Sequence, residues 1–114
     1  MKSKEINKKS FSEKVYSLLK KVPKGKVTTY KAVAEKLNTK AYRAVGQAMK
    51  RNQYAPKVPC HRVVASDGKI GGFMGSNNSD SKEVKKKIRL LRREGVKIKD
   101  NKVVDFEKVL FKFR

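Results

Sequence analysis

The 114-residue sequence is long enough for one domain with a single hydrophobic core and too short for two. Its 31 lysine and arginine residues stand against 10 acidic ones, a formal net charge of +21, which predicts a polyanionic partner. Nucleic acid is the first expectation, an anionic membrane surface the second, and a lysine-rich surface without such a partner the alternative. With one cysteine and one histidine, an internal disulfide and a structural Cys/His zinc site are excluded.

No apolar run approaches the roughly 20 residues of a membrane-spanning helix, and no signal-peptide core follows Met1. We therefore expect a cytoplasmic protein, nucleoid-associated in a prokaryote or nuclear in a eukaryote. A single thiol suits such a reducing compartment. We expect a monomer with no metal, no organic cofactor and no membrane partner.

Residues 1–9 are polar and rich in lysine, and we expect them to form a flexible basic arm before a single domain at 10–114. Ser10 and Glu13 have the spacing of a capping box, which predicts the start of a helix. Apolar residues then recur with helical spacing up to Pro23, which ends the helix. This stripe consists of Phe11, Val15, Leu18, Leu19 and Val22.

Two shorter helices are predicted next, joined by a tight polar turn. Thr29 is placed to cap a helix over 30–37, and Asn38-Thr39 supplies the turn and a cap for a helix that ends near Lys50. The inner faces are formed by Ala32, Val33 and Leu37 in the first helix and by Ala41, Ala44, Val45, Ala48 and Met49 in the second. Such a pair has the spacing of a helix-turn-helix, although ordinary packing of two amphipathic helices gives the same pattern.

The outer face of the second helix is polar and basic, and the net charge of the chain favours a role for this face in binding DNA. Gly46 leaves a gap in its side-chain surface. Because glycine within a helix costs about 1 kcal/mol relative to alanine, the gap is explicable if another backbone must come close. The side chains that point outward are Tyr42, Arg43, Gln47, Lys50 and Arg51.

The only cysteine and the only histidine of the chain are neighbours, Cys60 and His61. Pro59 fixes the backbone that enters them, and residues 62–65 have the pattern of a short buried strand. A lone thiol held beside an imidazole is a candidate nucleophile. The alternative is an inert buried thiol, with the histidine capping a strand.

A long loop and a fourth helix are predicted after this strand. A turn at Ser66-Asp67-Gly68 leads into a glycine-rich loop over 69–81, and long loops inside compact domains are usually functional or disordered. A very basic helix over 81–93 ends before Gly95, its expected C′ residue. The residues expected to point inward from this helix are Val84, Ile88, Leu90 and Leu91.

The chain is predicted to end with a small hairpin and a tail. Residues 96–98 and 103–106 alternate around Asp100-Asn101, which is typical of two short strands and their turn. The segment 109–113 is apolar enough to pack back on the core. No internal repeat is visible.

In this order, the features resemble the DNA-binding and active-site domain of the O6-alkylguanine-DNA alkyltransferases, the methylated-DNA–protein-cysteine methyltransferases. The resemblance runs from residue 11 to residue 113 and is specific because several motifs match together. They are Gly25-Lys26-Val27-Thr28-Thr29-Tyr30, Arg43-Ala44-Val45-Gly46-Gln47-Ala48-Met49, Asn52, Pro59-Cys60-His61-Arg62-Val63-Val64 and Leu90-Leu91-Arg92-Arg93-Glu94-Gly95. The resemblance implies a mostly α fold with a small β part, a winged helix-turn-helix-like domain that binds DNA and holds the active site.

The family's chemistry implies a role for four residues. Cys60 matches the cysteine that takes the alkyl group from guanine O6 and keeps it, so each molecule reacts once. His61 is expected to accept the thiol proton through a bridging water, with Glu94 orienting the imidazole. Tyr30 is expected to lie near the flipped base and to donate a proton to the purine. Without the motif, Glu94 reads as a surface carboxylate and Tyr30 as a half-buried aromatic.

The resemblance also implies how double-stranded DNA containing O6-alkylguanine is held. Arg43 matches an arginine that enters the duplex from the minor groove and fills the space of the extruded guanine. Asn52 matches an asparagine that ties the linker between the recognition helix and the active-site strand. The expected DNA-binding residues are Tyr30, Arg43, Gly46, Gln47, Asn52 and Ser66.

The base pocket is expected to involve Met49, Val63, Phe73 and Met74. Val63 matches a position whose carbonyl accepts the guanine amino group, and Met74 one whose N–H reaches O6. Core packing is the alternative role of these side chains. Phe73 stands where the family commonly has tyrosine and Met74 where it commonly has a small residue. The family's usual N-terminal domain is absent from this sequence.

We therefore expect DNA repair by direct damage reversal, with irreversible methyl transfer to Cys60. One alternative is a non-enzymatic alkyltransferase-like protein that binds alkylated guanine and recruits another repair pathway. Proteins of that kind also lack the N-terminal domain, but they typically carry another residue, often tryptophan, at the cysteine position. A winged-helix regulator is a weaker alternative, because it leaves the long glycine-rich loop unexplained. A Cys–His hydrolase is weaker still, because neither an oxyanion motif nor a third orienting residue apart from Glu94 is visible.

Overall fold

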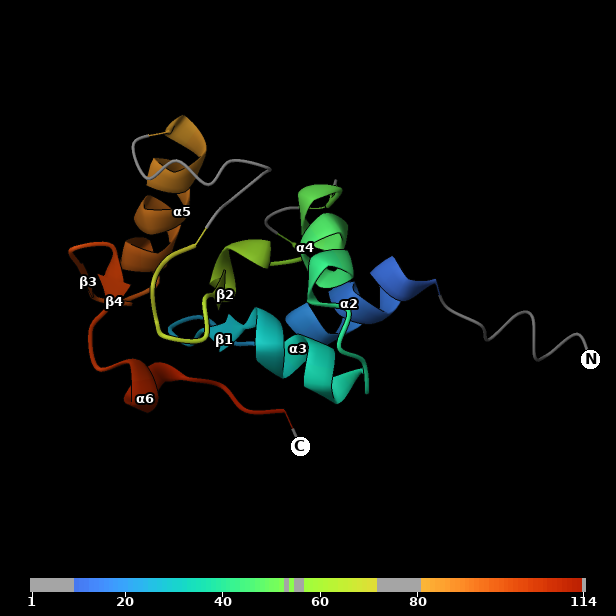
Figure 1. The fold of residues 1–114 in the computed structure, drawn as a ribbon. Helices are drawn as coiled ribbons and strands as arrows, with labels where there is room; N and C mark the ends of the chain where they lie inside the picture. The colour runs from blue at the N-terminus through green and yellow to red at the C-terminus, as the bar shows by residue number, and fades with distance from the viewer. Residues whose placement is uncertain (1–9, 53, 55–56, 72–80, 114) are drawn as a thin grey trace, which may run out of the picture.

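A computed structural model describes residues 10–113 of the chain, except 53, 55–56 and 72–80. Helices are the main regular structure of the described residues, and the two sheets have two strands each, which confirms the expected fold class (Figure 1). The elements are α2 (Phe11–Leu19), β1 (Thr28–Thr29), α3 (Tyr30–Lys36), α4 (Tyr42–Lys50), the 3-10 helix η1 (Cys60–Arg62), β2 (Val63–Val64), α5 (Lys82–Arg93), β3 (Ile98–Lys99), β4 (Lys102–Val103) and α6 (Phe106–Val109). Within the described residues, no helix has the length and apolar character needed to cross a membrane.

Helix α2 begins with the predicted capping box. Glu13 N–H donates to Ser10 Oγ at 3.1 Å, and Ser10 N–H donates to Glu13 Oε1 at 2.9 Å. The helix ends at Leu19, three residues before the predicted stripe does, because the N–H groups of Lys21 and Val22 donate to carbonyls three residues back. Val22 nevertheless remains buried.

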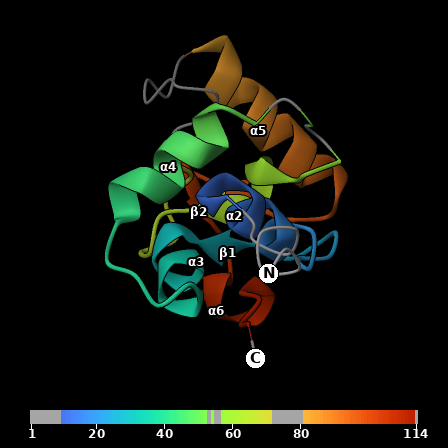
Figure 2. The ribbon, with the colours of Figure 1, turned by 90° about the vertical axis from the view of Figure 1, so that its right-hand side faces the viewer.

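The two helices of the helix-turn-helix are present, but their caps differ. Thr29 caps α3 as predicted, accepting a hydrogen bond from Ala32 N–H at 3.0 Å. The predicted cap at Thr39 is wrong: α4 begins only at Tyr42, and the Thr39 hydroxyl accepts from Ala41 N–H at 3.0 Å inside the turn. Ala41 is therefore exposed, although the helical pattern predicted it to be buried. Figure 2 shows α2, α3 and α4 gathered on one side of the molecule.

A parallel pair of short strands lies between α2, α3 and α4 on one side and α5 with the hairpin on the other (Figure 1). Residues 28–29, which precede the predicted helix over 30–37, form β1 and pair with β2 in the register Thr28 to Val63 and Thr29 to Val64. Val63 packs into the core cluster formed with α2, α3 and α4, and Val64 packs into the cluster formed with α5 and the hairpin. Strand β2 thus joins both clusters, which holds the residues before it in place.

The predicted strand over 62–65 is shorter than expected. Cys60, His61 and Arg62 form one turn of 3-10 helix, in which Arg62 N–H donates to Pro59 O at 3.0 Å. Two adjacent residues of a strand point in opposite directions. That rule does not apply to Cys60 and His61, because they lie in a helical turn. Only Val63 and Val64 are extended and paired.

The ends of α5 agree with the prediction. Ser81 Oγ accepts from Val84 N–H at 3.2 Å, and the helix closes at Gly95, whose φ is +96°. Gly95 N–H donates to Arg92 O, and the next N–H donates to Leu91 O, each at 3.0 Å. This is a Schellman motif, and it places the C-cap residue Glu94 at a fixed point at the end of α5.

The predicted hairpin is present with two-residue strands, β3 and β4, and both turn residues, Asp100 and Asn101, have positive φ. Phe106 was predicted at the end of the second strand but begins α6 instead. The tail packs back as expected: Val27 N–H donates to Val109 O at 2.9 Å, and Phe111 N–H donates to Val27 O at 2.7 Å.

Candidate active site and DNA-binding surface

Cys60 opens η1 and lies 6% exposed against the core cluster formed with α2, α3 and α4. Burial raises the pKa of its thiol, while a hydrogen bond with Asn52 and the positive charge of Lys87 act in the opposite direction. The net shift is upward, so the thiol is mostly protonated at neutral pH. A reaction that uses the thiolate therefore needs a group that removes the proton.

The structure brings His61 and Glu94 together, as the resemblance implies. His61 is 1% exposed, and its Nε2 lies 3.0 Å from Glu94 Oε2. Burial lowers the pKa of His61 more than the carboxylate raises it, so the imidazole is neutral at neutral pH. A neutral imidazole that donates its Nε2–H to a carboxylate has its lone pair on Nδ1, where it can accept a proton.

Arg62 completes this site, and the sequence reasoning gave it no role beyond membership of a motif. Its Nε donates to Glu94 Oε1 at 2.9 Å and its Nη2 to Glu94 Oε2 at 2.7 Å, while Nη1 donates to Val22 O at 2.6 Å. Burial alone would raise the pKa of Glu94, but the hydrogen bonds from Arg62 and His61 outweigh it and hold that pKa below its ordinary value. Glu94 is therefore a fixed carboxylate.

Tyr30 is the first residue of α3 and follows β1 directly, so the parallel strand pair holds it near the segment that contains Cys60. Burial, together with the charge of Cys60, raises the pKa of Tyr30 to about 12. The phenol therefore keeps its proton at neutral pH and can act as a hydrogen-bond or proton donor.

Lys87 was missed. It was not among the residues of the basic helix α5 expected to point inward, but its side chain is fully buried. Its Nζ donates to Val63 O and to Ile70 O, each at 2.6 Å. The signal was available, because Lys87 lies three residues after Val84 and four before Leu91, on the buried stripe of the helix. The carbonyl of Val63, which the resemblance assigns to the guanine amino group, keeps a second lone pair.

The buried lysine predicts how stability depends on pH. Burial lowers the pKa of Lys87 from 10.5 to about 7, so above pH 7 the unfolded chain holds a proton that the folded protein has lost. The free energy of unfolding should therefore rise between about pH 7 and pH 8.5, below the range in which thiols and phenols titrate. Urea unfolding at several pH values measures this slope. The slope should flatten in Lys87→Met, and an equal slope in that variant would contradict the prediction.

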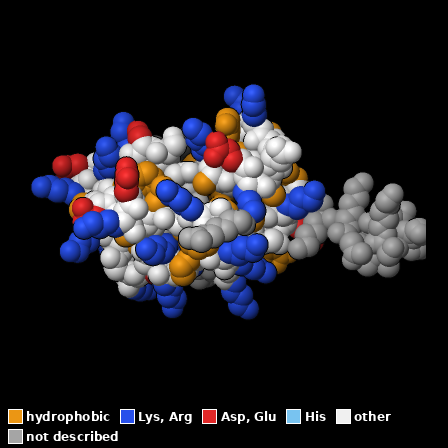
Figure 3. All heavy atoms as spheres, turned by 90° about the horizontal axis from the view of Figure 1, so that it is seen from below, with side chains coloured by type: hydrophobic (Ala, Val, Ile, Leu, Met, Phe, Trp, Pro, Cys, Tyr) orange, Lys and Arg blue, Asp and Glu red, His pale blue; other side chains and the backbone are white. Residues whose placement is uncertain are grey.

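Three of the residues expected to bind DNA lie on one face of α4, and the others lie in the linker after it, at the start of α3 and in the turn after β2. Arg43 and Gln47 are exposed on this face beside Gly46. Asn52 Nδ2 donates to Val58 O, and Tyr54 N–H donates to Asn52 Oδ1, each at 2.8 Å, so Asn52 ties the linker as the resemblance implies. Ser66 is exposed in the turn after β2. Figure 3, which views the molecule from below Figure 1, shows that basic side chains outnumber acidic ones on that face as well.

The structure describes only part of the expected base pocket. Met49 is 7% exposed and packs in the same core cluster as Cys60 and Val63. Phe73 and Met74 lie outside the described residues, so their assignment to the pocket stays a prediction.

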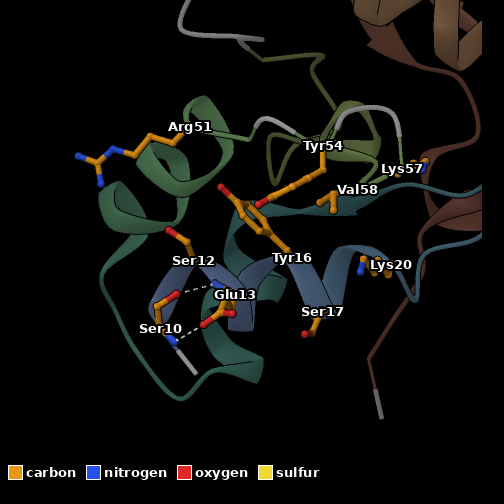
Figure 4. A pocket seen from close by; sticks show the side chains of 10 residues that line it. All are labelled: Ser10, Ser12, Glu13, Tyr16, Ser17, Lys20, Arg51, Tyr54, Lys57 and Val58. Carbon is orange, nitrogen blue, oxygen red and sulfur yellow. Dashed lines mark hydrogen bonds between the residues drawn. The ribbon is translucent and has the colours of Figure 1, made fainter. Parts of the chain in front are cut away.

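A separate hollow of about 670 Å³ lies between α2 and the linker after α4 (Figure 4). Tyr16 and Tyr54 meet there edge to face, with ring centroids 6.2 Å apart, and Arg51 lies at its rim. Among the described residues that line this hollow, none was assigned to the site from the sequence. Val58, which lines this hollow, also packs in the core cluster that contains Cys60.

The family model described as "6-O-methylguanine DNA methyltransferase, DNA binding domain" matches residues 10–96. The chain belongs to this family. A methylated-DNA–protein-cysteine methyltransferase of Archaeoglobus fulgidus is 47% identical over 88 residues, which are 76% of this chain and 57% of that protein. The protein of the same description from Saccharolobus solfataricus is 46% identical over 88 residues, 77% of this chain and 52% of that protein. The chain spans about half the length of these curated relatives.

Two solved structures show the same fold. The O6-methylguanine-DNA methyltransferase of Pyrococcus kodakaraensis strain KOD1 superimposes with a TM-score of 0.64 and 48% identity, over 77% of this chain and 47% of that chain. Atl1 of S. pombe, in complex with damaged DNA containing O6-carboxymethylguanine, gives a TM-score of 0.74 and 32% identity, over 90% of this chain and 94% of that chain. The resemblance predicted from the motifs is thus confirmed for the family and the fold.

Proposed function

We propose that this protein repairs DNA by direct damage reversal, flipping O6-alkylguanine out of the duplex and transferring the alkyl group irreversibly to Cys60. The observation that supports this proposal best is the arrangement at η1. A buried thiol is followed directly by a neutral imidazole, whose Nε2 lies 3.0 Å from the Glu94 carboxylate. A plain DNA-binding domain has no need of such an arrangement.

The chemistry divides among four residues. The thiol proton of Cys60 passes through a bridging water to His61 Nδ1, and Glu94 stabilises the imidazolium that forms. The thiolate attacks the alkyl carbon, so that an S–C bond forms while the C–O6 bond breaks. Tyr30 donates its proton to the purine ring, and the guanine leaves neutral. The thioether is not reversed, so each molecule reacts once.

The proposed partner is double-stranded DNA, as the DNA complexes of the structural relatives suggest. O6 of a stacked guanine cannot meet a buried thiol, so the base must leave the stack before attack. Arg43, exposed on α4, fills the space that the base leaves. The net charge of +21 supplies affinity that is independent of sequence and falls steeply with salt.

The alternative function is that of a non-enzymatic alkyltransferase-like protein, which binds alkylated guanine and recruits another repair pathway. One observation favours it: the match to Atl1 of S. pombe covers 90% of this chain with a TM-score of 0.74, against 77% and 0.64 for the methyltransferase of P. kodakaraensis. Cys60 and its partners favour transfer.

The test of this proposal measures repair of the lesion in the DNA. A duplex with one O6-methylguanine inside a methylation-blocked restriction site is incubated with increasing amounts of protein, below the amount of duplex, at low salt, and cleavage of the site is measured. Restoration of cleavage in proportion to the protein added supports direct reversal. Protection of the lesion without restored cleavage would support the alternative function.

Gly46 allows a further prediction. A Cβ built at this position meets nothing within 4 Å, so Gly46→Ala should stabilise the free protein by about 1 kcal/mol through helix propensity. If DNA approaches α4 at this gap, the same variant should bind duplex DNA about tenfold more weakly. Thermal unfolding and a gel-shift titration measure the two effects. Unchanged DNA affinity in the stabilised variant would remove Gly46 from the interface.

A further inference from the structure

Helix α5 carries a row of positive charge on the side that faces away from the core. Seven of its twelve residues are lysine or arginine, and Glu83 is its only acidic residue. Four of the basic residues have the spacing i, i+4, i+7 and i+11, so they lie one above another along the helix. All four are exposed, and we call them the basic row: Lys82, Lys86, Arg89 and Arg93.

The basic row lies opposite the buried side of the helix. Val84, Lys87 and Leu91 form that buried side, and Val84 and Leu91 pack in the cluster that contains the hairpin. Because successive residues of an α-helix are about 100° apart around its axis, the row is centred roughly 180° from these three residues. The packing of α5 on the core therefore makes no use of the row.

The basic row is not compensated by negative charge within the protein. Its members are three or four residues apart, the spacing at which like charges repel each other along a helix. In the described part of the chain, no ion pair involves a residue of the row. A row that destabilises its own helix is accounted for if a polyanion binds there and removes the repulsion.

The basic row and the DNA surface proposed on α4 face different sides of the molecule. The buried residues of α4 pack in the cluster with Cys60, whereas Val84 and Leu91 of α5 pack in the cluster with the hairpin. Helices α4 and α5 lie to either side of β2 in Figure 1 and again in Figure 2. Each helix turns its buried side toward the interior between them, so a straight duplex held on α4 leaves the basic row uncovered.

The chemistry of the row favours the phosphate backbone of DNA. Lys82 and Arg93 are about 16 Å apart along the helix, and duplex DNA carries one negative charge per about 1.7 Å of its axis, so the row can contact several phosphates at once. A membrane surface is disfavoured, because the apolar side of α5 that would enter the lipid is buried in the core. A protein partner is disfavoured because the row offers no aromatic or aliphatic anchor.

We propose that the basic row of α5 is a second DNA-binding surface, which holds the phosphate backbone of one duplex segment while α4 holds another. This inference rests on the proposed function in taking α4 as the surface for the segment with the lesion. A protein that holds two segments passes from one to the other without leaving the DNA, which shortens its search for a damaged base. Contacts with phosphates alone suit such a search, since they carry no sequence information.

The test measures whether one protein joins two duplexes. Undamaged duplexes that are long enough for one protein only carry either a donor or an acceptor fluorophore, and energy transfer reports that two of them are joined. With the parent protein, energy transfer should rise as protein is added and fall once protein exceeds duplex, because each duplex then has a protein of its own. A signal that keeps rising in excess protein would show that contacts between proteins join the duplexes, and it would overturn the proposal.

A row variant and a matched control separate the row from the overall charge. The row variant combines Lys82→Gln, Lys86→Gln, Arg89→Gln and Arg93→Gln, which keep a good helix former at each position. The control combines Lys14→Gln, Lys20→Gln, Lys24→Gln and Lys108→Gln, which remove the same charge from exposed positions outside α4 and α5. Energy transfer should fall about tenfold or more in the row variant and by less than about twofold in the control. The affinity for a single duplex should change equally in both.

The parent protein distinguishes failure of this proposal from failure of the proposed function. If it joins undamaged duplexes but transfers no methyl group from O6-methylguanine, the proposed function fails and the second DNA-binding surface stands. If it transfers the methyl group but joins no duplexes, the second surface fails and the proposed function stands.

Thermal unfolding at low salt tests the repulsion within α5. The row variant should unfold at the same temperature as the parent protein or a higher one, because like charges no longer lie four residues apart along the helix. A lower unfolding temperature in the row variant than in the control would contradict the premise of the proposal.

Two results of the energy-transfer experiment would also overturn the proposal. An equal loss in the row variant and the control would mean that charge spread over the whole surface joins the duplexes. Unchanged energy transfer in the row variant would mean that the row does not bind DNA. If that variant instead lost binding to phosphatidylserine vesicles or to polyglutamate, the row would serve a membrane surface or an acidic protein.

Discussion

Replacing Cys60 by alanine is expected to reduce methyl transfer to the level without protein and to leave binding of duplex DNA nearly unchanged. The thiolate is the only proposed nucleophile, whereas DNA affinity is expected from the basic surface and α4. The side chain is small and buried, so its truncation leaves a cavity of little more than one sulfur atom. Transfer is measured with a radiolabelled methyl group on the duplex, and binding by gel shift.

Val15→Ala is a suitable control, because it truncates another buried side chain of the same core cluster without removing a nucleophile. It should lower stability and retain measurable transfer. Full transfer in Cys60→Ala would mean that another residue receives the methyl group. Loss of DNA binding in that variant would mean that the thiol is needed for the fold.

Glu94→Ala is expected to have the largest effect on stability among the site variants. It removes the acceptor of two hydrogen bonds from Arg62 and leaves the guanidinium and the imidazole of His61 without their carboxylate. Breaking such a partly buried pair from one side costs about 3 kcal/mol. Urea unfolding at neutral pH measures the loss. Glu107→Ala, which removes an exposed acidic residue of α6, controls for the change of net charge.

The isosteric variant Glu94→Gln separates stability from chemistry. Glutamine can still accept from Arg62, so the protein should fold, but a neutral amide does not stabilise the imidazolium that forms on His61. The rate of methyl transfer in a single turnover should fall about a hundredfold. A normal rate in folded Glu94→Gln would contradict the role proposed for this carboxylate.

Features decided by a few neighbouring residues were predictable from the sequence. The capping box at Ser10, the cap at Thr29, the helix end at Gly95 and the turn at Asp100-Asn101 each depend on local backbone geometry, and all four are present. The mistaken cap at Thr39 shows the limit of this reasoning. Asn38 and Thr39 are both polar residues of one turn, and the side chain of either can accept a hydrogen bond from a nearby backbone N–H.

Features that depend on distant partners were not predictable in this way. Residues 28–29 form a strand only because β2 lies beside them, and two threonines alone give too short a signal. The contacts of Arg62 with Glu94 and Val22 join three separate parts of the chain. Lys87 was left out of the residues expected to point inward because it is charged, although it lies on the buried stripe of its helix.

The candidate site was predictable to the extent that motifs imply it. Cys60 and His61 were selected as neighbouring single residues of their kind, Glu94 was selected from the resemblance, and the structure brings the last two into contact. The resemblance gave roles to single residues, however, and the network that holds them was visible only in the structure. The assignments of Phe73 and Met74 stay predictions, since both residues lie outside the described part of the chain.

Intact-protein mass spectrometry after incubation with an excess of duplex containing O6-methylguanine tests the central claim most directly. We predict that the whole protein population gains the mass of one methyl group, that peptide mapping places it on Cys60, and that the undamaged duplex produces no gain. Tight binding of the damaged duplex with no change in the mass of the protein would contradict methyl transfer and would favour the non-enzymatic alternative.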